Sequence, residues 1–318
     1  MPGAQDLRPV YLVTGCAGFI GSHLSERLVR DGNLVVGVDC LTDHYPRRMK
    51  EENLKWLRGQ GNFTFLEEDL TSCRLGSVPA RELVIFHLAA RPGVRDSWGG
   101  TFEDYVRDNI LATQRLLEWA KDRKVEKFVY VSSSSVYGDA GELPSKEDGN
   151  PKPISPYGVT KLAAESLCYA YWRNFGIPVV VLRYFTVYGP RQRPDMAFYR
   201  FIRAILEDEE VEVYGDGTQT RDFTYVGDVV EATVRATELP DGEIFNVGSG
   251  SRISIKRAIE ILEGLMGRKA RVRYSDAMKG DIGDTYADIS KIRRFLDYNP
   301  KGLEEGLAEE IEWLRGSG

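Results

Sequence analysis

Histidine and cysteine are scarce in this chain, with three and four residues among 318. The cysteines form no C-x-x-C pair and the histidines lack metal-ligand spacing, so neither a metal site nor a disulfide scaffold is predicted. Apolar runs are short, and none approaches the roughly 20 residues of a membrane helix. The amino-terminal stretch shows no secretory signal, which predicts a cytoplasmic protein with no membrane partner.

Positive charge is also in short supply. Lys and Arg number 42 against 48 Asp and Glu, the formal net charge is −6 and the pI is about 5.4. Nucleic-acid binding needs a basic surface that neutralises phosphates, so no nucleic-acid partner is predicted. An anionic small molecule would have to be held by local groups.

The chain does contain a regular alternation of strand-like and helical segments. Apolar runs such as VYLVTG, LVVGVD and LVIFHLAA alternate with amphipathic or charged stretches. This pattern predicts βαβ units in an α/β fold, with a doubly wound parallel sheet of the Rossmann type. The main helices are expected at residues 19–30, 50–58, 102–121 and 157–175.

After Thr186 the elements become shorter, which predicts a second, smaller α/β lobe for the substrate. The stretches DFTYVGDVVEATVRA and EIFNVGS look like returns to the large sheet, so this lobe is expected to be discontinuous. The predicted larger domain, which contains the sheet, comprises residues 1–184 and 221–249. The predicted smaller lobe comprises residues 185–220 and 250–318.

The stretch TGCAGFIG places Gly15, Gly18 and Gly21 at the first strand-to-helix turn. Glycines there let a pyrophosphate approach the backbone amides of a helix N-terminus, although many helices begin with glycine for geometric reasons alone. Asp39 closes the next strand, where a carboxylate binds the ribose hydroxyls of NAD and repels the additional phosphate of NADP. NAD is therefore the predicted cofactor. Asp69 ends the third strand and is expected either to face the adenine or to cap a helix.

Tyr157 and Lys161 lie four positions apart in YGVTK, so on a helix both side chains share one face. An ammonium group beside a phenol stabilises the phenolate, as does an oxidised nicotinamide, and this would make Tyr157 a general base. Such pairs are common on exposed helices. The position after the strand and turn KFVYVSSSSVYG favours function, because a serine there can share a substrate hydroxyl with the tyrosine.

These motifs together resemble the extended short-chain dehydrogenase/reductase family, the NAD-dependent sugar-nucleotide epimerases and dehydratases. The resemblance covers nearly the whole chain, through TGCAGFIGSH, HLAA, SSSSVYG, SPYGVTKLAAE, LRYFTVYGP, RDFTYVGDVVEA and YADISK. It implies a catalytic triad of Ser133, Tyr157 and Lys161, with Asn109 supporting the site and Arg221 meeting the substrate diphosphate. The cofactor-binding residues that it implies are Gly15, Gly18, Phe19, Ile20, Gly21, Asp39, Asp69, Leu70, Leu88, Ala89, Ala90, Asn109, Tyr157, Lys161 and Tyr184.

Ser134 and Ser135 follow the triad serine, at positions where the family's dehydratases and decarboxylases carry acidic residues. Without an acid, a sugar oxidised at carbon 4 has no obvious onward route except return of the hydride. The resemblance therefore implies a 4-epimerase. NAD would take hydride from carbon 4, the 4-keto sugar would rotate, and hydride would return to its other face.

Three stretches are similar to the UDP-glucuronate 4-epimerases: VDCLTDHYPRRMKEENL, FTVYGPRQRPDMA and MKGDIGDTYADISK. A sugar carboxylate needs a cationic partner in a dry pocket, and arginine binds a carboxylate through two hydrogen bonds. Arg193 is the candidate, its alternative being a surface arginine beside a proline turn. The expected substrate-binding residues are Arg95, Ser134, Ser135, Thr186, Arg193, Arg221 and Asp281.

The sequence thus predicts conversion of UDP-glucuronate to UDP-galacturonate by a homodimer that pairs through helices 102–121 and 157–175. A UDP-glucose or UDP-N-acetylhexosamine 4-epimerase would share the same catalytic residues. A UDP-sugar dehydratase or decarboxylase, or an NAD-binding protein without catalysis, are further alternatives.

Overall fold

A parallel sheet of seven strands forms the centre of the computed structural model, which describes residues 8–72, 75–79, 81–139 and 141–316. The strand order is β11-β6-β5-β4-β1-β2-β3, and every neighbouring pair is parallel. This confirms the α/β, doubly wound fold. The strands are β1 (Val10–Thr14), β2 (Leu34–Asp39), β3 (Phe63–Glu67), β4 (Leu83–His87), β5 (Val125–Ser133), β6 (Val179–Tyr184) and β11 (Ile244–Val247).

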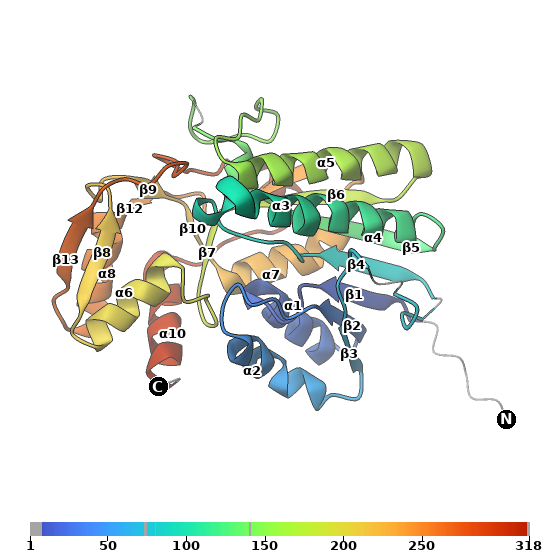
Figure 1. The fold of residues 1–318 in the computed structure, drawn as a ribbon, viewed down its shortest axis with the longest axis horizontal. Coiled ribbons are helices and arrows are strands. Elements are labelled where there is room, and N and C mark those ends of the chain that lie inside the picture. Colours follow the sequence, from blue (N-terminus) through green and yellow to red (C-terminus); the bar gives the residue numbers. More distant parts are fainter. Residues whose placement is uncertain (1–7, 73–74, 80, 140, 317–318) are drawn as a thin grey trace.

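Helices cover both faces of this sheet (Figure 1). Leu12 of β1 packs in a cluster with Leu116 and Ala164 on one face. Its neighbour Val13 packs in a second cluster with Leu24 on the other face, as the alternation of side chains along a strand requires. The helices that flank the sheet are α1 (Phe19–Arg30), α2 (Arg47–Arg58) and α7 (Val226–Arg235) on one side and α4 (Ala112–Ala120) and α5 (Pro156–Phe175) on the other.

The segment that the sequence predicts as one regular helix over 102–121 changes its winding. It consists of α3 (Phe102–Tyr105), a π-helical stretch η3 (Val106–Leu111) and then α4. Asn109, in the π-helical stretch, is 1% exposed and its amide bonds the backbone of Arg91 and the hydroxyl of Thr160. Because these partners are distant in sequence, local periodicity could not indicate the wider turn.

The second lobe is built from short elements beside the large sheet (Figure 1). β8 pairs with β13 in parallel, β7 with β10 in parallel, and β9 with β12 in antiparallel fashion. The elements are β7 (Thr186–Tyr188), α6 (Ala197–Leu206), β8 (Glu210–Tyr214), β9 (Thr220–Arg221), β10 (Phe223–Tyr225), β12 (Ile253–Ser254), α8 (Ile255–Met266), β13 (Arg271–Ser275), α9 (Ser290–Phe295) and α10 (Leu303–Gly316). Short 3-10 turns complete the chain at η1 (Arg95–Ser97), η2 (Gly99–Thr101), η4 (Ser134–Val136) and η5 (Ala236–Glu238).

Both stretches that look like returns to the large sheet do come back to it, in different ways. EIFNVGS supplies β11, which pairs with the edge strand β6. DFTYVGDVVEATVRA contributes the helix α7, which packs beside α1, whereas its strand β10 pairs with β7 instead. The domain boundaries themselves stay a prediction.

Two further expectations concern disulfides and membrane-spanning helices. Cys16, Cys40 and Cys168 are free thiols, and Cys73 lies outside the described residues. Within the described ranges, no helix is long and apolar enough to cross a membrane.

Candidate active site

A cavity of about 470 Å³ lies at the carboxyl ends of the sheet strands. The strand order reverses between β1 and β4, and in open parallel sheets ligands bind in the crevice at such a point. The structure brings most of the predicted site residues to this one cavity. Those that line it are Gly15, Gly18, Phe19, Ile20, Gly21, Asp39, Asp69, Leu70, Leu88, Ala89, Ala90, Ser133, Ser134, Ser135, Tyr157, Lys161, Tyr184, Thr186 and Arg193.

At the dinucleotide end, the turn after β1 has no room for side chains. Gly15 has a φ of +73°, and a Cβ atom there would lie 2.9 Å from the backbone nitrogen of Ala89. A Cβ on Gly21 would lie 2.1 Å from the carbonyl oxygen of Gly15. The start of α1 therefore keeps a bare backbone surface, which fits a pyrophosphate at a helix N-terminus.

The two predicted carboxylates of this end are held by short turns. Asp39 accepts hydrogen bonds from the backbone nitrogens of Ala17, at 3.1 Å, and Leu41, at 2.8 Å. Burial raises the pKa of Asp39, while nearby Lys50 and the two amides oppose the shift. Asp69 accepts from the backbone nitrogen and hydroxyl of Thr71, so it caps a turn while also lining the cavity.

At the catalytic end, the first turn of α5 lies directly against the serine turn. Ser155 caps the helix by accepting a hydrogen bond from the nitrogen of Gly158 at 3.1 Å. A Cβ on Gly158 would come within 2.5 Å of the carbonyl oxygen of Ser135, so only glycine permits this approach. The contact places the hydroxyl of Tyr157 in hydrogen-bond range of Ser133.

Burial changes the ionisation of both Tyr157 and Lys161. Burial raises the pKa of Tyr157, and the opposing influences are its hydrogen bond with Ser133 and the charge of Arg193. Lys161 donates to the carbonyl of Val131 at 2.7 Å, and burial lowers its pKa to about 8. In the chain without NAD, burial outweighs the hydrogen bond and the charge that act on the phenol, and acidification of Tyr157 by Lys161 stays a prediction.

At the end predicted to bind the sugar, the predicted residues that line the cavity supply hydroxyls and the guanidinium of Arg193. Ser133 donates to Ser135 at 3.1 Å, and Thr186 is fixed by the pairing of β7 with β10. The side chain of Arg193 is 16% exposed, and its Nε and Nη2 donate to the carboxylate of Asp195 at 3.0 and 2.9 Å. This end can thus offer neutral donors and one cation to a ligand.

Four predicted residues do not line the cavity. Arg95 forms an ion pair with Asp281 at 2.8 Å, and its guanidinium lies 4.2 Å from the centre of the Tyr214 ring. Arg221 donates to backbone carbonyls of the chain. Asn109 connects η3 to the loop after β4 and to α5 instead of facing the cavity. Their roles toward ligands stay predictions.

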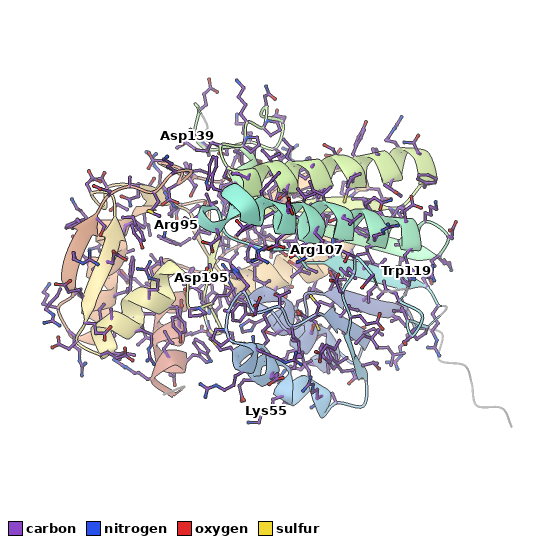
Figure 2. All side chains as sticks on the ribbon, viewed as in Figure 1. Lys55, Arg95, Arg107, Trp119, Asp139 and Asp195 are labelled. Atoms are coloured by element: carbon purple, nitrogen blue, oxygen red, sulfur yellow. The ribbon has the colours of Figure 1, made fainter. Side chains whose placement is uncertain are left out.

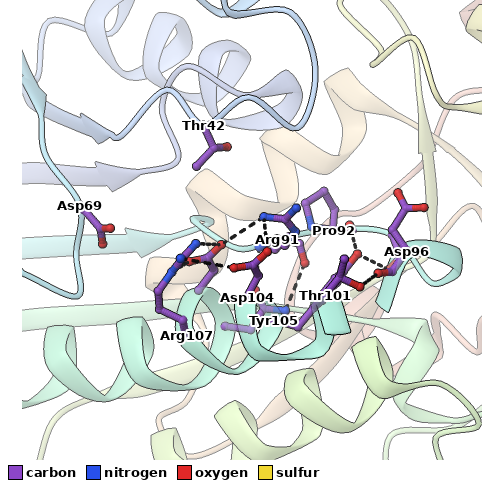
Figure 3. A network of polar contacts seen from close by, with 12 residues as sticks. Thr42, Asp69, Arg91, Pro92, Asp96, Thr101, Asp104, Tyr105 and Arg107 are labelled. Carbon is purple, nitrogen blue, oxygen red and sulfur yellow. Dashed lines mark hydrogen bonds and ion pairs between the residues drawn. The ribbon is translucent and has the colours of Figure 1, made fainter. Parts of the chain in front are cut away.

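Several cavity residues were not singled out from the sequence. Arg91 follows HLAA and forms ion pairs with Asp104, at 3.3 Å, and Asp108, at 3.9 Å, in the network drawn in Figure 3. His44 and Tyr45 lie in the loop after β2 and also line the cavity. The segment after Asp39, within VDCLTDHYPRRMKEENL, was the signal in the sequence that could have pointed to His44 and Tyr45. The sequence alone does not show which side chains of this segment face the cavity.

His87 is the last residue of β4. His87 is 1% exposed and bonds the hydroxyls of Thr14 and Thr113, and burial lowers its pKa to about 3. It is a packed strand residue. No group of three or more His, Cys, Asp or Glu side chains suited to a metal occurs in the part of the chain that the structure describes.

Comparison with known proteins gives consistent matches. The model of the NAD dependent epimerase/dehydratase family matches residues 11–248. An uncharacterised UDP-glucose epimerase of Bacillus subtilis is 47% identical over 307 residues, covering 95% of this chain and 97% of that protein. A UDP-glucuronate 4-epimerase of Thermodesulfobacterium geofontis is 43% identical over 312 residues, covering 96% of each.

Solved structures agree with these matches. The crystal structure of UDP-glucuronic acid 4-epimerase from Bacillus cereus, in complex with UDP-glucuronic acid and NAD, has a TM-score of 0.93 and 45% identity, covering 97% of this chain and 100% of that one. The sequence match, the fold and the cavity at the switch point all agree. This chain belongs to the NAD-dependent epimerase/dehydratase family.

Proposed function

We propose that this protein is an NAD-dependent UDP-sugar 4-epimerase that interconverts UDP-glucuronate and UDP-galacturonate. One observation carries the proposal: Ser133, Tyr157 and Arg193 line the same cavity. Arg193 is close enough to Tyr157 to lower its pKa against the effect of burial. A base and a carboxylate-binding cation thus face the same ligand, and the relatives that act on UDP-glucuronate support this substrate.

NAD fits the dinucleotide end. The bare backbone from Gly15 to Gly21 would hold the pyrophosphate, and Asp39 would accept hydrogen bonds from the ribose hydroxyls. When bound, NAD accepts a hydride from carbon 4 of the sugar and supplies it again. The negative charge of Asp39 disfavours the additional phosphate of NADP.

Side chains of this protein accept and return the proton of the sugar 4-hydroxyl. Tyr157 takes the proton of the 4-hydroxyl as the carbon–hydrogen bond breaks, and Ser133 shares a hydrogen bond with the same oxygen. After the 4-keto sugar presents its other face, Tyr157 gives the proton back to that oxygen. Hydride and proton both return, so the reaction inverts carbon 4 with no net oxidation.

The sugar end also has to protect the intermediate. A 4-keto sugar with a carboxylate at carbon 6 is a β-keto acid, which loses carbon dioxide readily. Arg193 would hold the carboxylate, while Ser134 and Ser135 offer only neutral donors. The carboxylates that line the cavity belong to the ends of β2 and β3 and to η3, as Asp39, Glu68, Asp69 and Asp108.

The homodimer and the cytoplasmic location remain proposals. Apolar side chains are exposed on the two helical segments that the sequence assigns to the dimer. Val106 and Leu111 of η3 and Val159 and Tyr169 of α5 are 37%, 38%, 45% and 58% exposed. Such surfaces support pairing with a second copy.

The direct test is to incubate the purified protein with UDP-glucuronate and to identify the products by NMR and mass spectrometry. We expect UDP-galacturonate of unchanged mass, formed up to an equilibrium mixture. Turnover of UDP-glucose far above that of UDP-glucuronate would instead favour the UDP-glucose epimerase alternative. The name of the Bacillus subtilis relative supports that alternative.

A further inference from the structure

The loop after β2 carries two polar groups that lack hydrogen-bond partners. Nε2 of His44 and the hydroxyl of Tyr45 are buried, and neither has a hydrogen-bond partner among the residues that the structure describes. Both residues line the cavity. Lys50 holds this loop, because its ammonium donates to the carbonyl of Thr42 at 2.8 Å and to its hydroxyl at 3.0 Å. The two groups therefore have fixed positions beside the site.

Charged side chains of two other loops influence the ionisation of His44. Arg193 and Asp195 belong to the segment after β7, and Arg91 and Asp96 to the segment after β4. On its own loop, the Tyr45 ring meets the imidazole edge-on at 6.4 Å. Burial lowers the pKa of His44, Arg193 and Arg91 add to the effect, and the two carboxylates oppose it. The imidazole of the free chain therefore loses its proton at a lower pH than an ordinary histidine.

The arginine that would meet the sugar carboxylate is already neutralised. Asp195 occupies the edge of the Arg193 guanidinium formed by Nε and Nη2. Nη1 makes no hydrogen bond with any residue in the described ranges, so the edge formed by Nη1 and Nη2 can receive a ligand. Figure 2 labels Asp195 among the side chains of the whole molecule.

A second cation is not available from Arg91. Its ion pairs with Asp104 and Asp108 are shared with Arg107, so two arginines face two carboxylates there (Figure 3). A sugar carboxylate on the open edge of Arg193 would place two carboxylates on one guanidinium. The cluster would then carry one negative charge too many in a largely closed site.

We propose that His44 supplies the compensating charge, by taking up a proton when the carboxylate of a uronic acid sugar nucleotide binds to the open edge of Arg193. His44 is then a positioning and specificity residue, not a catalytic one. A neutral hexose adds no charge and needs no proton. This inference rests on the proposed function for the identity of the ligand, and it adds a residue and a proton that the reaction itself does not require.

The direction of the pH effect follows from linkage. The pKa of His44 is lowered in the free chain and rises in the complex, where the bound carboxylate cancels the charge of Arg193. Between these two values binding takes up a proton. Affinity for the uronate therefore falls as the pH rises through the higher value, while affinity for the hexose stays level.

The experiment is calorimetric titration of the NAD-loaded protein near pH 6.5, in buffers of different ionisation enthalpy. The Tyr157→Phe background prevents turnover during the titration. We expect net proton uptake with UDP-glucuronate and none with UDP-glucose. His44→Gln should abolish the uptake and weaken UDP-glucuronate about 10-fold relative to UDP-glucose, the effect of about one pKa unit. Asp43→Asn, an exposed change in the same loop, is the matched control and should keep the uptake.

A second variant keeps the test independent of how His44→Gln folds. Asp195→Asn leaves Arg193 with its full charge, so UDP-glucuronate should bind without proton uptake while His44 is still present. Uptake that persists in His44→Gln, or equal weakening of both sugars, would overturn the proposal. Turnover of UDP-glucuronate by the wild-type protein is measured separately, so a failed epimerase assay with intact proton uptake would reject the proposed reaction alone.

Discussion

The two ends of the cavity are built in different ways. The dinucleotide end contains a turn of bare backbone, where Gly15 and Gly21 leave no room for added atoms. The sugar end consists of side chains from separate segments, such as Ser135, Arg193 and His44, which lie at the ends of β5, β7 and β2. One end depends on the absence of side chains and the other on the charges that side chains carry.

Because of this difference, the two ends of the cavity should respond differently to substitutions. A close backbone contact cannot relax around a new atom, so the dinucleotide end should fail whenever a side chain is added. Charges on loops can be exchanged without moving the sheet, so the sugar end should change its preferred ligand while the fold persists. Tyr157 lies where the two ends meet, and its loss should have the largest effect.

Tyr157→Phe removes the proton acceptor and retains the ring. We expect kcat to fall about 1,000-fold, within the range for a lost general base, while NAD and UDP-glucuronate still bind. Steady-state kinetics and equilibrium titration of each ligand measure the two effects. Tyr169→Phe, an exposed change on the same helix, is the control. Wild-type activity in Tyr157→Phe would show that the base is another group.

Gly21→Ala tests the dinucleotide end. The new methyl would lie 2.1 Å from the carbonyl oxygen of Gly15, so the turn must shift. We expect the affinity for NAD to fall about 100-fold and the melting temperature to drop, because overpacking of this kind costs about 1–3 kcal/mol. Gly61→Ala is the matched control, since a Cβ there meets nothing within 4 Å. Equal NAD binding by both variants would contradict the steric account.

Arg193→Gln tests the sugar end. Loss of hydrogen bonds from a charged donor costs about 1.5–3 kcal/mol, so the KM for UDP-glucuronate should rise about 30-fold. The KM for UDP-glucose should change much less, and NAD binding should not change. Arg203→Gln, a half-exposed change on the following helix, is the control. A parallel rise of KM for both sugars would place Arg193 outside the carboxylate subsite.

The ionisation of Lys161, between the two ends of the cavity, can be tested through the pH dependence of the protein's stability. Burial lowers its pKa to about 8 from an ordinary value of 10.5. Between these values the unfolded chain binds more protons than the folded one, so this group makes stability rise with pH. In NAD-free protein, chemical denaturation should show that the free energy of unfolding of the wild type, relative to that of Lys161→Met, increases by roughly 1 kcal/mol from pH 8 to pH 9.5. A flat difference would contradict the shifted pKa.

Ser135→Glu has the smallest expected effect. A carboxylic acid beside the triad serine can protonate the neighbouring carbon, so a small share of turnovers, about a few per cent, should end as decarboxylated UDP-pentose. Mass spectrometry of the products detects the loss of carbon dioxide, and Ser134→Ala serves as a neutral control in the same turn. The absence of any pentose from Ser135→Glu would remove support from the argument based on the missing acid.

The sheet, its flanking helices and the dinucleotide end could be predicted because local sequence determines them. Apolar strands alternate with amphipathic helices, and the Gly15 to Gly21 turn lies within one βα unit. The placement of Ser133 beside Tyr157 could also be predicted, since Ser133 ends β5 and Tyr157 lies in the first turn of α5, the helix that follows this strand. These features require only short-range patterns and the rules of parallel sheets.

Features that depend on distant contacts could not be predicted. The π-helical winding at Asn109 follows from its bonds to Arg91 and Thr160, which belong to other elements. The raised pKa of Tyr157 depends on the depth of burial, which no spacing reveals. The proposed role of His44 depends on charged side chains that two other loops contribute. Tertiary packing, not local pattern, decides each of these.

The central claim is that one hydride leaves and returns to carbon 4. The most direct measurement is proton NMR of the products formed from UDP-glucuronate labelled with deuterium at carbon 4. The account predicts UDP-galacturonate that retains the deuterium at carbon 4, with no label lost to water. Loss of the label to solvent, or its recovery at carbon 5, would contradict it.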